Sequence, residues 1–165
     1  MSGLKNLLIT LLITIFITAI SGFMVDRPAE AMTQSFQWTG KAGYSARGRF
    51  SYDETEVFTT ISEQGAGKTN ILKSLIVTFY NPSGEPISTY ENVVNGIASG
   101  NYFEFHFNPI TQKLFGSIDL GGEFAGEMYL KGEVDRQLSS IEVDSSGIDR
   151  TVDKNLGAIL ISPMV

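Results

Sequence analysis

The sequence contains no cysteine and a single histidine, His106, in 165 residues. Without cysteine the chain has neither a disulfide framework nor a lipid-modified N-terminal cysteine, so its stability depends on the burial of apolar side chains. A zinc or copper centre usually takes at least three protein ligands, commonly His or Cys, and the composition therefore disfavours both metals. We expect no metal and no other cofactor.

Charge is also scarce, because Asp, Glu, Lys and Arg make up only 18% of the chain. The formal net charge of −6 disfavours nucleic acid as a partner, since an acidic surface repels phosphate groups. Complete catalytic motifs are missing as well. There is no G-x-S-x-G nucleophile elbow, and nothing in the sequence selects a pair among carboxylates such as Glu123, Glu127 and Glu133. A non-enzymatic role is favoured.

The stretch SEQGAGKTNI, residues 62–71, matches the end of the phosphate-binding motif G-x-x-x-x-G-K-[ST]. However, Ser62 stands where the motif requires its first glycine. The residues that follow, 71–80, have the β-branched and aromatic composition of a strand, whereas the motif requires a helix at this point. We interpret the stretch as a Gly-Ala-Gly hairpin loop with a solvated Lys68.

An uncharged apolar segment, residues 7–25, follows a short N-terminal region with one cation, Lys5. Together with the A-x-A sequence that ends at Ala31, it predicts a secretory signal peptide over residues 1–31, with cleavage after Ala31. The alternative is an uncleaved membrane anchor, because the 19 apolar residues approach the roughly 20 that span a bilayer. Either way we expect an exported protein, in the periplasm, the thylakoid lumen or outside the cell, that contacts a membrane only through this N-terminal hydrophobic helix.

Beyond residue 31, apolar residues recur at every second position between turns rich in glycine and proline. This alternation predicts short β-strands, and no convincing helical stripe is present. The segments that fit best are 36–39, 71–80, 87–94, 102–107, 113–120, 127–134, 140–143 and 157–162. We expect residues 32–165 to form a single all-β domain of about 8–10 short antiparallel strands, either a β-sandwich or a small β-barrel.

Three polar residues, Tyr102, Glu104 and His106, are the candidate ligand-binding residues. Because side chains alternate along a strand, these three lie on one face and the interleaved phenylalanines on the other. We expect the phenylalanine face to be buried in the hydrophobic core. The polar face points either to solvent or, in a barrel, to a lumen that could accept a small amphipathic molecule.

The acidic stretch 144–149, with Asp153 beyond it, places oxygen ligands near a turn. It does not match the spacing of an EF-hand calcium loop. Asp, Ser and Gly are common turn residues, so we interpret this stretch as an ordinary turn.

Four short stretches carry a resemblance: Trp38-Thr39-Gly40, Gly48-Arg49-Phe50-Ser51-Tyr52-Asp53, Leu72-Lys73-Ser74-Leu75 and the TFYNPSG segment that follows. In these the chain resembles exported β-rich bacterial proteins, common in cyanobacteria, many of which carry a PEP-CTERM sorting tail. The sequence departs from that group at Ser162-Pro163-Met164-Val165, where it has no Pro-Glu-Pro motif. The resemblance implies an extracytoplasmic β domain of unassigned role.

Together these features predict an exported, non-enzymatic β domain that binds a small ligand or a protein partner in the cell envelope or lumen. One alternative is a small β-barrel enzyme, a hydrolase or an isomerase, that uses His106. Another is a structural envelope component that residues 7–25 hold in the membrane.

Overall fold

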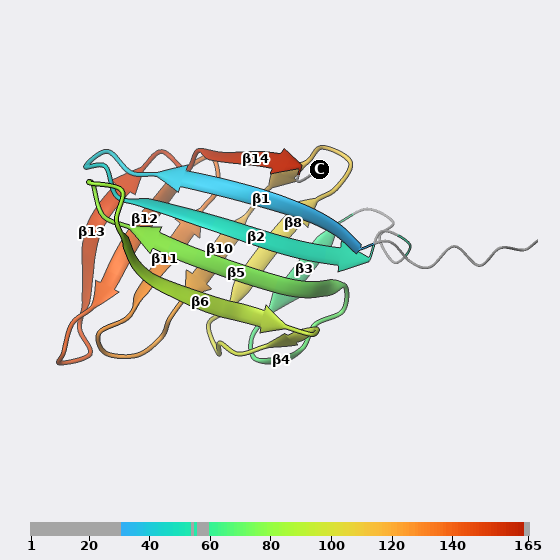
Figure 1. Cartoon of the computed structure of the whole chain (residues 1–165), viewed down its shortest axis with the longest axis horizontal. Helices are drawn as coiled ribbons and strands as arrows, with labels where there is room; N and C mark the ends of the chain where they lie inside the picture. Colours follow the sequence, from blue (N-terminus) through green and yellow to red (C-terminus); the bar gives the residue numbers. More distant parts are fainter. Residues whose placement is uncertain (1–30, 54, 56–59, 164–165) are drawn as a thin grey trace, which may run out of the picture.

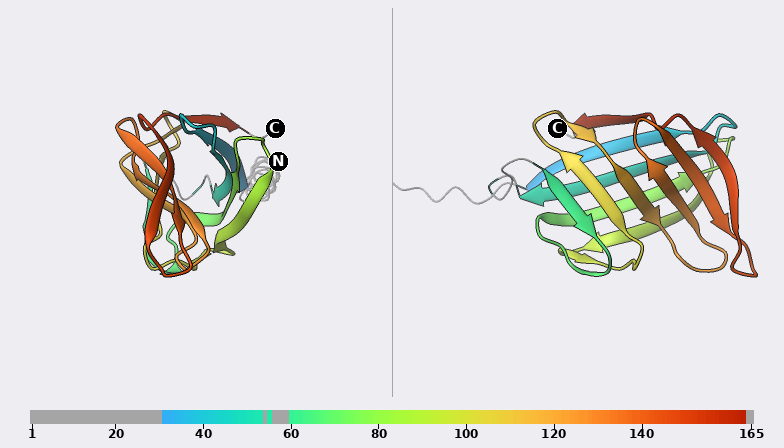
Figure 2. Two further views of the ribbon diagram at one scale, coloured as in Figure 1. Left: turned by 90° about the vertical axis from the view of Figure 1, so that its left-hand side faces the viewer. Right: turned by 180° about the vertical axis from the view of Figure 1, so that it is seen from behind.

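The computed structural model describes residues 31–53, 55 and 60–163, and the regular structure in this part of the chain is entirely β-strand. All the strand pairings within these residues are antiparallel. The strands form two sheets, which Figures 1 and 2 show from three sides. The predicted all-β, antiparallel class is therefore confirmed.

The two sheets contain seven strands each. In spatial order, the first sheet contains β14 (Ile159–Pro163), β1 (Ala31–Thr39), β2 (Ser45–Asp53), β5 (Leu72–Tyr80), β6 (Pro86–Val94), β7 (Ile97–Ala98) and β4 (Gly67–Lys68). The second sheet contains β13 (Asp149–Asn155), β12 (Gln137–Val143), β11 (Met128–Glu133), β10 (Ser117–Gly121), β8 (Glu104–Asn108) and β3 (Ile61–Gln64), with β9 (Lys113–Leu114) paired to β8. In Figure 1 the strands of the second sheet cross behind those of the first.

The sheets pack face to face around one apolar core. The end-on view in Figure 2 shows the two sheets facing each other. Phe50 of the first sheet lies 5.0 Å from Phe105 and 4.8 Å from Phe107 of the second sheet, measured between ring centroids. Each sheet keeps its own outermost strands, β14 and β4 in the first and β13 and β3 in the second. The fold is thus a β-sandwich, and the barrel alternative is wrong because the sheets do not join into one closed sheet.

The described part of the chain contains fourteen strands, more than the predicted number. Three of them, β4, β7 and β9, are only two residues long. The predicted strand over 113–120 is divided into β9 and β10, because Gly116 adopts a φ of 65° and interrupts the extended backbone. The polar segment that forms β13 was not predicted to be a strand.

Residues 62–71 do not form a phosphate-binding loop. The strand β5, rather than a helix, begins at Leu72, and the stretch connects β3 of the second sheet to the first sheet instead of closing a hairpin. The carboxylate of Glu63 accepts hydrogen bonds from the backbone N–H groups of Asn70, Ile71 and Leu72 at 2.8 to 3.2 Å. The carboxylate of Glu63 therefore already accepts from the backbone N–H groups that could otherwise bind an external anion.

No helix within residues 31–53, 55 and 60–163 is long and apolar enough to cross a membrane. The predicted signal peptide or anchor, with its apolar segment 7–25, lies outside the described residues. β1 begins at Ala31 and pairs along its whole length with β2. The described domain thus begins beside the expected cleavage site, and cleavage itself stays a prediction.

Candidate functional site

β8 directs its phenylalanines into the core and its polar side chains to the outer face of the second sheet. Phe105 and Phe107 are fully buried, whereas Glu104 and His106 are partly exposed. Tyr102 precedes the strand and is 70% exposed. The predicted alternation is confirmed within β8, but its polar face lies on the outside of the sandwich. The expectation of a polar barrel lumen is therefore wrong.

His106 lies among neighbours from β3, β8 and the segment after β9. Its Nδ1 is 3.0 Å from Oγ of Ser62, and its Nε2 is 3.1 Å from Oε1 of Glu104. The same oxygen of Glu104 accepts a hydrogen bond of 2.8 Å from Gln64. The ring of Phe115 lies 5.5 Å from the imidazole, centroid to centroid. Glu104 and His106 thus belong to a network of surface side chains.

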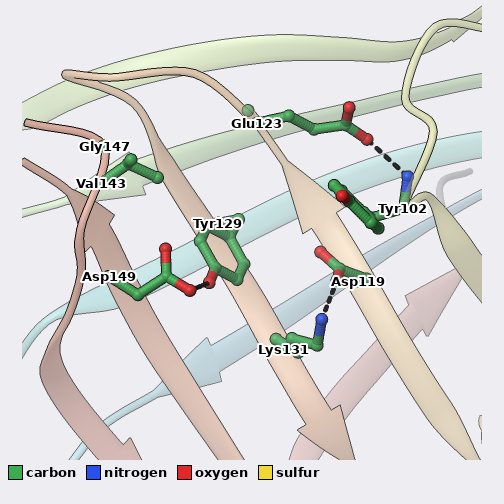
Figure 3. A pocket seen from close by; sticks show the side chains of 9 residues that line it. Tyr102, Asp119, Glu123, Tyr129, Lys131, Val143, Gly147 and Asp149 are labelled. Atoms are coloured by element: carbon green, nitrogen blue, oxygen red, sulfur yellow. Dashed lines mark hydrogen bonds and ion pairs between the residues drawn. The ribbon is translucent and has the colours of Figure 1, made fainter.

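A pocket of about 310 Å³, which we call the main pocket, opens on the same outer face beside Tyr102 (Figure 3). It lies where the β10–β11 loop, the β12–β13 loop and the segment before β8 meet. The pocket is lined by Tyr102, Asp119, Gly122, Glu123, Tyr129, Lys131, Val143, Gly147 and Asp149. Of the three predicted binding residues, only Tyr102 belongs to this pocket.

Two side-chain pairs shape the floor of the main pocket, and Figure 3 shows both. Nζ of Lys131 lies 2.8 Å from Oδ2 of Asp119, directly across the pairing of β10 with β11. The hydroxyl of Tyr129 donates a hydrogen bond of 2.7 Å to Oδ2 of Asp149. Tyr129 and Lys131 are two residues apart on β11, so the strand directs both to the same face.

The β10–β11 loop brings Glu123 to the rim of the main pocket. Oε1 of Glu123 accepts a hydrogen bond of 2.6 Å from the backbone N–H of Tyr102 (Figure 3). Oε2 of Glu127 in turn accepts a hydrogen bond of 2.8 Å from the backbone N–H of Glu123. Carboxylates thus hold the backbone of the loop and of the segment before β8 in place.

Burial and local hydrogen bonds set the proton affinities of the groups in the main pocket. The pKa of Asp119 is raised, because desolvation by burial outweighs the hydrogen bond and the charge of Lys131. The pKa of Lys131 is raised chiefly by its hydrogen bond to Asp119. The pKa of Tyr129 is raised first by burial and then by its hydrogen bond to Asp149. At neutral pH the site therefore presents a neutral tyrosine hydroxyl and a cationic lysine.

The substitution Lys131→Met is expected to raise the pKa of Asp119 further. It removes the hydrogen bond and the positive charge that lower this pKa, and it leaves the burial and the charges of Glu123 and Glu104 that raise it. Titration of the Asp119 carboxyl carbon by NMR, in the wild type and the variant, measures both values. A lower Asp119 pKa in the variant would contradict this electrostatic description.

The same shift gives the sign of the pH dependence of stability. The pKa of Asp119 in the folded protein lies above its ordinary value of 3.8, so the folded state binds this proton more tightly than the unfolded state does. The stability linked to Asp119 is therefore fully present below that ordinary value and declines as the pH rises through the folded-state pKa. In Lys131→Met this decline extends over a wider pH interval.

The acidic turn at 144–149 contributes one side chain, Asp149, to the main pocket. Oδ1 of Asp144 accepts hydrogen bonds from the backbone N–H groups of Ser146 and Ile148 at 2.7 and 3.0 Å, as in an ordinary Asx turn. Over the residues that the structure describes, no three His, Cys, Asp or Glu side chains are grouped so as to hold a metal ion.

Comparisons with known proteins give no match: no family model, no curated protein and no solved structure matches the chain. The resemblance to exported proteins with a PEP-CTERM tail therefore stays a prediction. Support for a function comes from the geometry and the chemistry of the main pocket.

Proposed function

We propose that the chain is an exported β-sandwich domain that binds a small, neutral, hydroxyl-rich molecule, such as a sugar, in the main pocket. The observation that carries the proposal is the combination in one pocket of an exposed aromatic ring, Tyr102, with the carboxylates of Asp119, Glu123 and Asp149. The sequence of residues 1–31 supports export, to the cell envelope or a lumen.

The carboxylates make the main pocket rich in hydrogen-bond acceptors. An ionised carboxylate has about four acceptor positions, and the bonds within the protein use only part of the capacity of Asp119, Glu123 and Asp149. Sugar hydroxyls can donate to the remaining positions. They can also accept from the ammonium group of Lys131, which is half exposed.

Tyr102 provides a flat apolar surface at the rim of the main pocket. Its backbone is held by the hydrogen bond to Glu123, so the exposed ring projects from a fixed position. The face of an aromatic ring carries partial negative charge and attracts weakly positive C–H groups. One face of a sugar ring is lined by such groups, so stacking on Tyr102 would complement hydrogen bonding to the carboxylates.

The charges of the main pocket disfavour anionic ligands. Three carboxylates and one ammonium group line the pocket, and their negative sum repels phosphates and carboxylates. The negative sum attracts a ligand cation, but Lys131 competes with it at the aromatic ring, because Nζ of Lys131 already lies 5.9 Å from the centroid of the Tyr102 ring. A neutral polyol is not repelled by the carboxylates and does not compete with the charge of Lys131.

The competing hypothesis of an enzyme has one supporting feature, the hydrogen-bonded pair of His106 and Glu104. This pair does not line the main pocket, and His106 is also engaged by Ser62. We therefore favour binding over catalysis. Binding to a protein partner and a structural role in the envelope remain alternative hypotheses.

Tyr102→Ala is expected to weaken the binding of a monosaccharide. For a ligand of this size, about 0.3 kcal/mol per non-hydrogen atom corresponds to a Kd on the order of 1 mM. Loss of an aromatic contact of about 0.5 to 1.5 kcal/mol would raise that Kd roughly two- to tenfold. NMR titration with glucose and with N-acetylglucosamine measures the change.

Two control variants accompany this titration. Tyr102→Phe keeps the ring and is expected to keep the affinity. Leu160→Ala changes a similarly exposed apolar side chain on β14 of the first sheet and is expected to have no effect. An unchanged Kd in Tyr102→Ala, or an equal loss in Leu160→Ala, would count against a site at Tyr102.

A further inference from the structure

A second pocket, of about 160 Å³, adjoins the main pocket at the β10–β11 loop, and we call it the side pocket. Gly122 and Glu123 line both pockets, so the loop forms their common boundary. The side pocket is lined by Tyr90, Glu91, Asn92, Ser99, Gly100, Gly121, Gly122, Glu123, Phe124 and Glu127.

The side pocket has the same kind of chemistry as the main pocket. It contains a highly exposed ring, that of Phe124, which is 71% exposed, much like Tyr102. Beside this ring lie carboxylates, among them those of Glu91 and Glu123. Each pocket thus combines one exposed aromatic ring with hydrogen-bond acceptors, and Glu123 is shared by both.

The backbone that carries Phe124 is held in a fixed position. Oε2 of Glu127 accepts hydrogen bonds from the backbone N–H groups of Glu123 and Phe124 at 2.8 and 2.9 Å. The buried side chain of Asn92 donates to the carbonyl of Gly121 at 2.7 Å and accepts from its N–H at 3.0 Å. The loop is thereby tied to β6 of the first sheet, so little conformational freedom is lost when a ligand binds.

The volumes of the pockets favour a ligand longer than one sugar ring. Small-molecule sites usually enclose about 300 to 1,000 Å³. The main pocket, at about 310 Å³, lies at the lower limit, and the side pocket, at about 160 Å³, is too small to be a site by itself. A ligand confined to the main pocket would leave the ring of Phe124 in water.

We propose that the two pockets form one groove for a linear, neutral oligosaccharide of two or three units. Tyr102 stacks on one unit and Phe124 on the next, and Glu123 hydrogen-bonds to hydroxyls near the linkage between them. This inference rests on the proposed function, because it names the ligand class of the same site.

The test is calorimetric titration of the full exported protein with three series of probes, each containing a monomer, a dimer and a trimer. The series are glucose linked β-1,4, glucose linked α-1,4 and N-acetylglucosamine linked β-1,4. In at least one series the trimer is expected to bind at least tenfold more tightly than the monomer. Phe124→Ala is expected to reduce this advantage to threefold or less while the Kd of the monomer changes by less than twofold, and Phe124→Tyr is expected to retain it.

The outcomes separate this inference from the proposed function. Equal affinity for monomer and trimer, or an advantage of the trimer that persists in Phe124→Ala, would overturn the groove and leave monosaccharide binding in place. No binding in any series would overturn both proposals. The cationic glucosamine trimer, linked β-1,4, is titrated beside the neutral series as a control for charge. Binding of this trimer alone, weakened by salt, would also overturn both proposals, because it would indicate recognition of charge.

Discussion

Phe50→Ala is expected to lower the free energy of unfolding by about 3 to 5 kcal/mol, the usual range for removal of a buried phenylalanine ring. Phe50 is 0% exposed and contacts the rings of Phe105 and Phe107 in the opposite sheet. The substitution removes these edge-to-face contacts and leaves a cavity between the two layers. Both the lost ring contacts and the cavity weaken the packing of one sheet against the other.

Urea denaturation followed by tryptophan fluorescence measures this loss, because the single tryptophan, Trp38, is buried in the same core. Phe124→Ala is the matched control, since it removes the same ring from an exposed position. Its effect is expected to stay within about 0.5 kcal/mol. Similar losses in the two variants would contradict the assignment of Phe50 to the centre of the core.

Glu63→Ala is expected to destabilise the fold by about 2 kcal/mol or more, because it leaves the buried N–H of Leu72 and the partly buried N–H of Ile71 without this partner, and a buried donor without a partner costs about 1 to 3 kcal/mol. Glu63 is 3% exposed, and its carboxylate accepts from the N–H groups of Asn70, Ile71 and Leu72. These bonds hold the connection between the two sheets against the start of β5. Alanine cannot replace any of them.

Glu63→Gln provides the comparison, because it keeps one acceptor oxygen and nearly the same volume. It is expected to cost less than Glu63→Ala, and the amides of residues 70–72 are expected to exchange with solvent faster in both variants. Urea denaturation and amide hydrogen exchange give the two readouts. If Glu63→Ala left stability and exchange unchanged, the carboxylate would have no structural role at this connection.

Much of the fold follows from local pattern. Segments 71–80 and 87–94 correspond closely to β5 and β6, because alternation of apolar residues reports which face of a strand is buried. The choice between sandwich and barrel does not follow from such a pattern. It depends on which distant strands pair, for example β14 with β1, and this pairing joins the two ends of the domain.

β13 was missed because its sequence, DRTVDKN, is mostly polar. Its position is fixed by pairing with β12 and by the buried carboxylate of Asp153. This carboxylate accepts hydrogen bonds from the backbone N–H groups of Ala42 and Tyr44 in the β1–β2 turn. A contact between residues more than one hundred positions apart leaves no signal in local periodicity.

The candidate site could be predicted only in part. The polar residues of β8 were placed correctly on one face, but the pocket forms on neighbouring strands and loops. Alternation within 127–134 already indicates that Tyr129 and Lys131 share the face opposite Met128 and Leu130. That Lys131 lies across from Asp119 depends on the register of the β10–β11 hairpin, which the glycine-rich break between the two predicted strands did not define.

The sugar site that we propose on the outer face of the second sheet is tested most directly by mapping NMR chemical shifts. The protein, with its backbone amides assigned, is titrated with the neutral trimers of glucose and of N-acetylglucosamine. We expect the largest shift changes at residues 99–103, 119–131 and 147–149. Changes centred on the first sheet or around His106, or none at tens of millimolar sugar, would contradict the proposed site.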